Sequence, residues 1–135
     1  LNAGRTVVCD RFLDSTLAYQ AGSDAARQKI ALDLHRTFCF DLTPDLTFLL
    51  DVDPEVGLTR SGRRIAVEGS AERRFEAMDL EFHRSLREAY RARARLDPAR
   101  YVVIDAARRP QEIAERIYGE VRQRFGKRIG IVDYA

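Results

Sequence analysis

The sequence has no tryptophan, one methionine and only two cysteines, Cys9 and Cys39, among its 135 residues. Two cysteines cannot build the disulfide framework of a small secreted domain, and with His35 and His83 they show no metal-ligand spacing. Both cysteines stand in apolar surroundings, so we expect them at core positions. The sequence does not open with a charged segment followed by an apolar one, the pattern of a secretory leader. This predicts a protein of the reducing cytoplasm.

Long apolar runs are also missing, and none approaches the roughly 20 residues that cross a membrane. Lysine is nearly absent: of the 23 basic residues, only Lys29 and Lys127 are lysine and the other 21 are arginine. The net charge of +2 is too small to predict a nucleic-acid partner. Arginine forks onto phosphate and carboxylate groups, although the base composition of the gene explains such a bias equally well.

What is present suits one folded domain, because 45% of the residues are apolar and 33% are charged. Three nearly continuous apolar segments predict strands that are covered on both faces, as in a parallel sheet. They are residues 6–10, 46–52 and 101–105. Each segment has aspartate at or next to its end, at the sheet edge where open α/β folds bind ligands. These carboxylates are Asp10, Asp51, Asp53 and Asp105.

Helical patterns lie between the expected strands. Ile30, Leu34 and Phe38 form one apolar stripe, residues 75–90 repeat with helical spacing, and a last helix begins at Pro110. We expect Gly126 to cap that last helix. The order β-α-β-α-β-α predicts an α/β fold.

Two segments do not follow these patterns. Residues 60–74 contain five arginines and two glycines with little periodicity, which predicts a mobile loop. The tail, residues 127–135, has a strand-like core at residues 129–132. Three strands are also fewer than the about five of an ordinary sheet. We therefore expect residues 1–126 to be the later part of a larger domain, or to take further strands from elsewhere.

The first chemical motif is Asp10-Arg11-Phe12, directly after a strand. An aspartate at a strand end can orient a magnesium-bound water, and an arginine beside it can clamp a phosphate. Tyr19 can pack on a sugar. Three more side chains offer hydrogen bonds to the edge of a base: Ser15, Thr16 and Gln20. The structural alternative is a helix start capped by Asp14 or Ser15.

Four segments, taken in their order and spacing, resemble bacterial members of the thymidylate kinase family. They are DRFLDSTLAYQ (residues 10–20), PDLTFLLDVDPEVGLTR (44–60), RRFE (73–76) and YVVIDA (101–106). The resemblance covers roughly residues 1–125. It implies a P-loop nucleoside monophosphate kinase with a parallel sheet and helices on both faces. It further implies transfer of the γ-phosphoryl group of ATP to dTMP with Mg²⁺, and a homodimer.

The resemblance also implies roles for single residues. Arg11 matches the arginine that holds the acceptor phosphate, and Asp10 matches the aspartate that supports the phosphate loop and, indirectly, Mg²⁺. Tyr19 matches the aromatic side chain on the deoxyribose. The positions near the thymine are Ser15, Thr16 and Gln20. The lid is about residues 60–74, with catalytic arginines at Arg60, Arg63, Arg64 and Arg74. The loop that lines the adenine is Ala106, Ala107 and Arg108.

One family motif is missing, because the 135 residues contain no Gly-x-x-x-x-Gly-Lys-[Ser/Thr] segment. The resemblance therefore implies that the N-terminal part of the domain, with its central strand, lies outside this sequence. We expect the chain by itself to be an inactive portion of the kinase, and we expect apolar strand faces to be uncovered.

Other readings stay open. A deoxynucleoside kinase shares the Asp-Arg motif, and a non-catalytic fragment can bind a nucleotide without turnover. An arginine-rich helix that binds nucleic acid is a third alternative, with Arg84, Arg87 and Arg91 near one face. Glu81 and Glu88 lie among these arginines, which favours a solvated outer face and no nucleic-acid partner.

Overall fold

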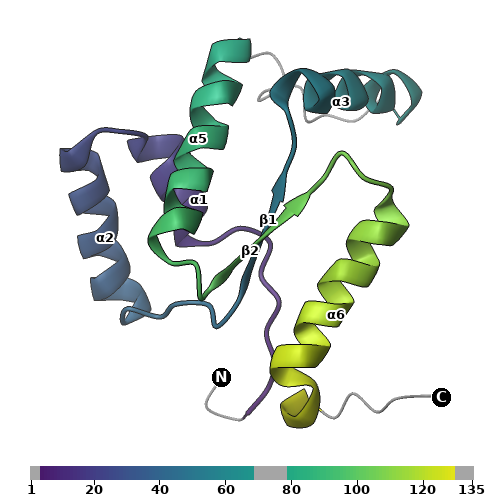
Figure 1. Cartoon of the computed structure of the whole chain (residues 1–135). Helices are drawn as coiled ribbons and strands as arrows, with labels where there is room; N and C mark the ends of the chain where they lie inside the picture. Colours follow the sequence, from purple (N-terminus) through teal and green to yellow (C-terminus); the bar gives the residue numbers. More distant parts are fainter. Residues whose placement is uncertain (1–3, 69–78, 130–135) are drawn as a thin grey trace.

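The computed structural model describes residues 4–68 and 79–129, with the backbone alone for residues 62–68. Two strands lie among six helical segments of this described part (Figure 1). In chain order the elements are α1 (Leu13–Thr16), η1 (Leu17–Ala21), α2 (Ala25–Cys39), β1 (Thr47–Asp51), α3 (Pro54–Glu68), α5 (Leu80–Leu96), β2 (Tyr101–Asp105) and α6 (Pro110–Ile129).

The strands β1 and β2 form a parallel pair, with a register that runs from Thr47 opposite Tyr101 to Asp51 opposite Asp105. Both strands lie inside the segments expected from the sequence, so these two predictions are confirmed. Figure 1 shows α5 and α6 on opposite sides of the pair, and both helices contact β2. This arrangement is the expected α/β layering.

The strand expected over residues 6–10 is not formed, and this prediction is wrong. The segment has no regular structure, and Val8 is 95% exposed. A strand is defined by its ladder of hydrogen bonds to a neighbour, and β1 pairs only with β2 within the described residues. The β-branched residues of this segment favour an extended chain but do not supply a neighbour.

The loop expected over residues 60–74 is also wrong for residues 60–68, which continue the helix α3. Pro54 occupies the first helical position, and the Asp53 carboxylate accepts a hydrogen bond from the Glu55 amide at 3.0 Å. Each glycine inside a helix costs about 1 kcal/mol, which the other residues of α3 offset. Arg63 and Arg64 thus have helical backbone, whereas Arg74 lies outside the described residues.

The helix α6 begins at Pro110 as expected but does not end at Gly126. It continues through Lys127 and Arg128, whose positive charges suit the negative end of the helix dipole. Ile129 is helical, which contradicts a strand at that residue, and residues 130–135 lie outside the described part.

The buried core lies where η1, α5 and β2 meet. Its apolar members are Leu17, Ala18, Ala21, Ala94, Tyr101, Val102 and Ile104. Leu50 and Val103 on the two strands are about half exposed, which confirms the expected uncovered strand faces. Cys9 is exposed and Cys39 is half-buried, so the core positions expected for both cysteines are wrong.

The apolar stripe of α2 points away from this core. Ile30, Leu34 and Phe38 are 60%, 52% and 72% exposed, respectively. A neighbouring face of the helix carries the buried His35, whose Nε2 lies 2.8 Å from the Leu42 carbonyl oxygen. Core packing therefore does not explain the stripe.

Among the helices of the described ranges, none combines the length and the apolar character needed to traverse a lipid bilayer.

Candidate functional site

The Asp-Arg motif lies in the segment that leads into α1, and its arginine has an unusual backbone. Arg11 has a φ of +66°, in the left-handed region that residues with a Cβ rarely adopt. Such a conformation costs about 1 kcal/mol or more and persists where the surrounding structure imposes it, commonly at functional sites. The guanidinium carbon lies 5.3 Å from the centre of the Tyr19 ring, and both Arg11 and Asp10 are exposed. The motif therefore presents one positive and one negative group to solvent.

Tyr19 belongs to a group of aromatic rings between η1 and α5. Its ring centre lies 6.3 Å from that of Phe82 and 6.4 Å from that of Tyr90. The Ser15 Oγ lies 2.7 Å from the Tyr90 hydroxyl, whereas Thr16 and Gln20 are exposed. The structure thus brings Arg11 and Tyr19 together, and it directs Ser15 toward α5.

Asp14 is the most deeply buried carboxylate near this motif. Its side chain is 10% exposed and accepts hydrogen bonds from Arg93 Nε at 2.7 Å and from Arg100 Nη1 at 2.9 Å. Arg100 also donates to Thr47 Oγ1 at 3.1 Å. We call Asp14, Arg93 and Arg100 the Asp14 cluster. It ties the helix after the Asp-Arg motif to α5 and to the start of both strands.

The Asp14 cluster shifts the titration of its members. Burial acts to raise the pKa of Asp14, but the hydrogen bonds from Arg100 and Arg93 outweigh burial and lower the pKa from 3.8 to about 2. Burial and the neighbouring carboxylate raise the pKa of Tyr101 to about 12. The carboxylate of Asp14 is therefore ionised at neutral pH.

The expected cap role for Asp14 or Ser15 is wrong, because α1 has no side-chain cap.

The aspartates at the strand ends are engaged within the fold. Arg87 forks onto Asp51 at 2.7 and 3.0 Å and reaches Asp53 at 3.2 Å. The hydrogen bond from Arg87 lowers the pKa of Asp51. Asp105 Oδ1 accepts from the Ala107 amide at 2.9 Å. The solvated position expected for Arg87 is wrong, because its side chain is 28% exposed.

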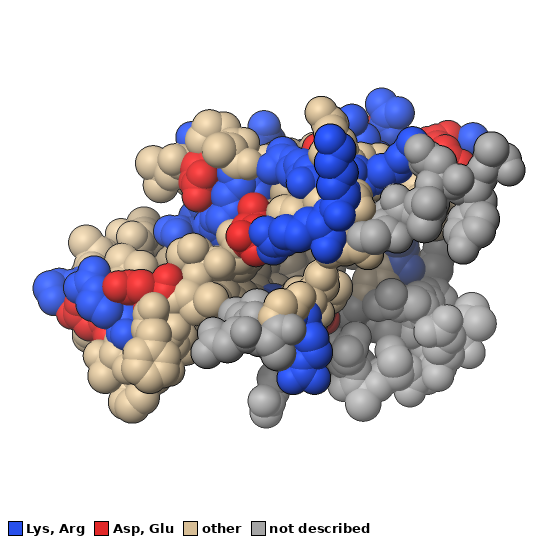
Figure 2. All heavy atoms as spheres, turned by 90° about the horizontal axis from the view of Figure 1, so that it is seen from below, with Lys and Arg blue, Asp and Glu red and all other residues tan. Residues whose placement is uncertain are grey.

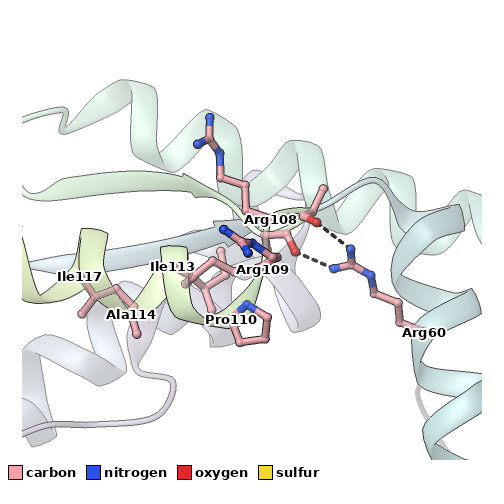
Figure 3. A pocket seen from close by; sticks show the side chains of 10 residues that line it. Arg60, Arg108, Arg109, Pro110, Ile113, Ala114 and Ile117 are labelled. Carbon is pink, nitrogen blue, oxygen red and sulfur yellow. Dashed lines mark hydrogen bonds between the residues drawn. The ribbon is translucent and has the colours of Figure 1, made fainter.

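A second candidate region lies between β1, α3, α6 and the turn that follows β2 (Figure 3). It is an open cavity of about 640 Å³ with an apolar floor that includes Leu50, Ile113 and Ile117. The expected adenine loop, Ala106 to Arg108, forms part of its wall. Arg60 reaches this loop from α3, where its guanidinium donates to two main-chain carbonyl oxygens.

A smaller cavity of about 280 Å³ lies between β1, α3 and α5, and His83 and Tyr90 line it. The His83 Nε2 is buried and has no hydrogen-bond partner within the described part of the chain. Nothing in the sequence patterns pointed to this imidazole.

Metal ligands do not gather in the described ranges, where no three His, Cys, Asp or Glu side chains are grouped to hold an ion. Magnesium is commonly held by one or two carboxylates together with substrate phosphates. The exposed carboxylate of Asp10 fits that kind of donor set.

Figure 2, which views the molecule from below, shows several groups of basic side chains with acidic groups beside them and other residues between. On α6, Arg116 and Arg124 both pair with Glu120, at 2.7 and 3.4 Å. On α5, Arg91 and Arg95 pair with Glu88 at 3.6 and 3.7 Å. These pairs match the interleaved charges seen in the sequence.

A family model described as thymidylate kinase matches residues 1–117 of the chain. The chain belongs to the thymidylate kinase family. The thymidylate kinase of Solidesulfovibrio magneticus is 48% identical over 123 residues, which are 90% of this chain and 59% of that protein. That of Pelobacter propionicus is 47% identical over 125 residues, which are 91% of this chain and 57% of that protein. The chain thus spans a little over half the length of these thymidylate kinases.

Membership in the thymidylate kinase family confirms the resemblance and the fold class inferred from it. The side chains of Arg63 and Arg64, like Arg74, lie outside what the structure describes. Sequence reasoning missed side chains of α5 and of the segment before β2 that lie beside the motif. They are Phe82, Tyr90 and Arg93 on α5, and Arg100 directly before β2. No local signal finds them, because Arg93 and Arg100 lie 79 and 86 residues after Asp14.

Proposed function

We propose that this chain carries the acceptor-nucleotide part of a cytoplasmic enzyme that phosphorylates dTMP to dTDP with ATP, a step toward dTTP. The observation that carries the proposal is Arg11, which is held in a left-handed conformation with its guanidinium exposed beside Tyr19. Strained backbone that aims a phosphate-binding side chain at solvent suits a binding site better than a packing role. The names of the curated relatives support the same reaction.

In this proposal Arg11 forks onto the phosphate of dTMP, and the Tyr19 ring lies against the deoxyribose. Thr16 and Gln20 approach the thymine, and Ser15 acts near it through its hydrogen bond to Tyr90. Asp10 holds Mg²⁺ indirectly, through bound water. When bound, Mg²⁺ neutralises charge on the phosphates of ATP.

The donor half of the reaction involves the cavity beside the turn that follows β2. Here the turn formed by Ala106, Ala107 and Arg108 lines the adenine of ATP, and the arginines expected in the lid neutralise the transferring phosphoryl group. Of the four arginines expected in the lid, Arg63, Arg64 and Arg74 keep this role, whereas Arg60 donates to main-chain carbonyl oxygens of the turn. Phosphoryl transfer needs positioning and positive charge more than covalent help from the protein. Arginine suits this chemistry because it stays charged at all physiological pH values.

Calorimetric titration of the 135-residue chain with dTMP, UMP and AMP tests the acceptor site. We expect dTMP to bind at least about tenfold more tightly than UMP, which lacks the thymine methyl and carries a 2′-hydroxyl. Turnover of ATP with dTMP is not expected from the chain by itself. Equal affinity for all three nucleotides, or no binding, contradicts the acceptor site. Selective binding without turnover after the phosphate-loop segment is supplied favours the alternative of a non-catalytic nucleotide-binding protein.

We also propose that two copies of the chain pair through α2. Its exposed stripe of Ile30, Leu34 and Phe38 offers three neighbouring apolar side chains, of the kind that anchor interfaces. Sedimentation is expected to show a dimer for the natural chain and a monomer for Leu34→Glu. Tyr118→Glu, at an exposed position on α6, serves as the control and is expected to stay dimeric. A natural chain that stays monomeric at high concentration contradicts the pairing.

A further inference from the structure

Arg60 forms a two-pronged contact between elements that are far apart in the sequence. Its Nη1 donates to the Ala106 carbonyl oxygen and its Nη2 donates to the Ala107 carbonyl oxygen, both at 2.7 Å. Figure 3 shows the guanidinium reaching from α3 across to this turn. The two ends of the guanidinium thus engage two successive carbonyl groups, 46 and 47 residues away.

The same turn is held from two other directions. The Ala106 amide donates to the Asp51 carbonyl oxygen at 2.8 Å, and the Ala107 amide donates to Asp105 Oδ1 at 2.9 Å. With Arg60 in place, both amides and both carbonyls of these two alanines have partners. A short turn after a strand has few side-chain contacts of its own, so these bonds fix its backbone before any ligand arrives.

The lining of the cavity beside this turn suits a ring with apolar faces that carries an anionic chain. Ile113 and Ile117 line it from α6, and Leu50 lines it from β1. Arg108 and Arg109 also line it and supply positive charge (Figure 3). The guanidinium of Arg60 is directed at the turn, so it acts on the backbone wall of this cavity.

We propose that Arg60 is a positioning residue for the base of the donor nucleotide and not a ligand of its phosphates. This inference rests on the proposed function, which places adenine at this turn. Arg60 fixes the backbone against which the base packs, so its loss weakens binding of the base portion. Binding of the phosphate portion does not change.

The test separates the two portions of the donor. The 135-residue chain and its Arg60→Ala, Arg60→Lys and Arg84→Ala variants are titrated with adenosine and, separately, with inorganic tripolyphosphate, with NMR shifts as the readout. Arg60→Ala is expected to weaken adenosine binding about tenfold and to leave tripolyphosphate binding unchanged. Lysine offers a single point of donation, so the affinity of Arg60→Lys for adenosine is expected to lie between those of the natural chain and of Arg60→Ala.

Arg84→Ala is the matched control, because Arg84 joins α5 to α3 through Glu55 at 2.6 Å and does not line the cavity. It is expected to bind both probes as the natural chain does. Amide hydrogen exchange at Ala107 adds a readout without ligand, and it is expected to speed up in Arg60→Ala only.

Two results overturn the positioning role alone: Arg60→Ala binds adenosine like the natural chain, or it loses tripolyphosphate binding. A natural chain that binds tripolyphosphate but not adenosine overturns the adenine assignment of the proposed function together with this inference. Unchanged exchange at Ala107 in Arg60→Ala overturns the contact on which the inference stands.

Discussion

Replacing Asp14 by asparagine is expected to lower the free energy of unfolding by about 3 kcal/mol or more at neutral pH. The substitution leaves the guanidinium groups of Arg93 and Arg100 partly buried without their counter-charge. The side chains of these two arginines are only 27% and 14% exposed, so water replaces the lost carboxylate poorly. A loss of this size is a large share of the about 5–15 kcal/mol that stabilises an ordinary domain. Denaturant unfolding followed by circular dichroism measures it.

The Asp14 cluster also predicts a dependence of stability on pH. The folded pKa of Asp14, about 2, lies below the ordinary value of 3.8, so its stabilisation is complete above pH 3.8. It is lost as the pH falls through the folded pKa. The shift corresponds to about 2 kcal/mol. Asp14→Asn is expected to lack this part of the acid response.

Asp33→Asn is the matched control for Asp14→Asn. Asp33 also pairs with basic neighbours, Lys29 and Arg36, but on the exposed surface of α2, where water screens the charges. We expect Asp33→Asn to leave the unfolding transition nearly unchanged. A second check is the double variant Asp14→Asn with Arg100→Met, which is expected to lose less than the sum of the single variants. Additive losses, or an Asp14→Asn chain as stable as the natural one, contradict the role of the Asp14 cluster.

Replacing Arg11 by alanine is expected to weaken dTMP binding by about 10-fold to 100-fold. A forked hydrogen bond to a phosphate is charge-assisted at both ends, and alanine removes both donors. Arg11→Lys keeps a point charge without the fork, so its affinity for dTMP is expected to lie between those of the natural chain and of Arg11→Ala. Calorimetry with dTMP measures the three affinities.

The left-handed backbone at Arg11 allows binding and folding to be separated. Glycine has no Cβ, so Arg11→Gly relieves the strain at φ +66° and is expected to stabilise the chain by about 1 kcal/mol relative to Arg11→Ala. It is nevertheless expected to bind dTMP as poorly as the alanine variant. Arg27→Ala, an exposed arginine that pairs with Asp24 on α2, is the control and is expected to bind dTMP normally. Arg11→Ala with undiminished affinity for dTMP contradicts the phosphate role.

Local patterns predicted most of the regular structure. The strands β1 and β2 follow from their apolar runs, and α2, α5 and α6 follow from helical spacing. Residues 6–10 have the same apolar character but form no strand, because the pairing of a strand depends on a neighbour and not on its own residues. Residues 60–68 show the reverse case, because an arginine-rich segment with weak periodicity continues a helix that Asp53 and Pro54 start.

By itself, the sequence determined the fold class, the family and the place of the Asp-Arg motif, because short-range patterns carry all three. Only the tertiary structure decided what individual arginines do, out of the 21 present. Arg87 holds Asp51, Arg100 holds Asp14 and Arg60 holds a turn, at separations of 36, 86 and 46 residues. All three side chains carry the same charge, and their roles differ with the partner that folding brings within hydrogen-bond distance. That partner is set by the packing of helices on the sheet, which no local pattern encodes.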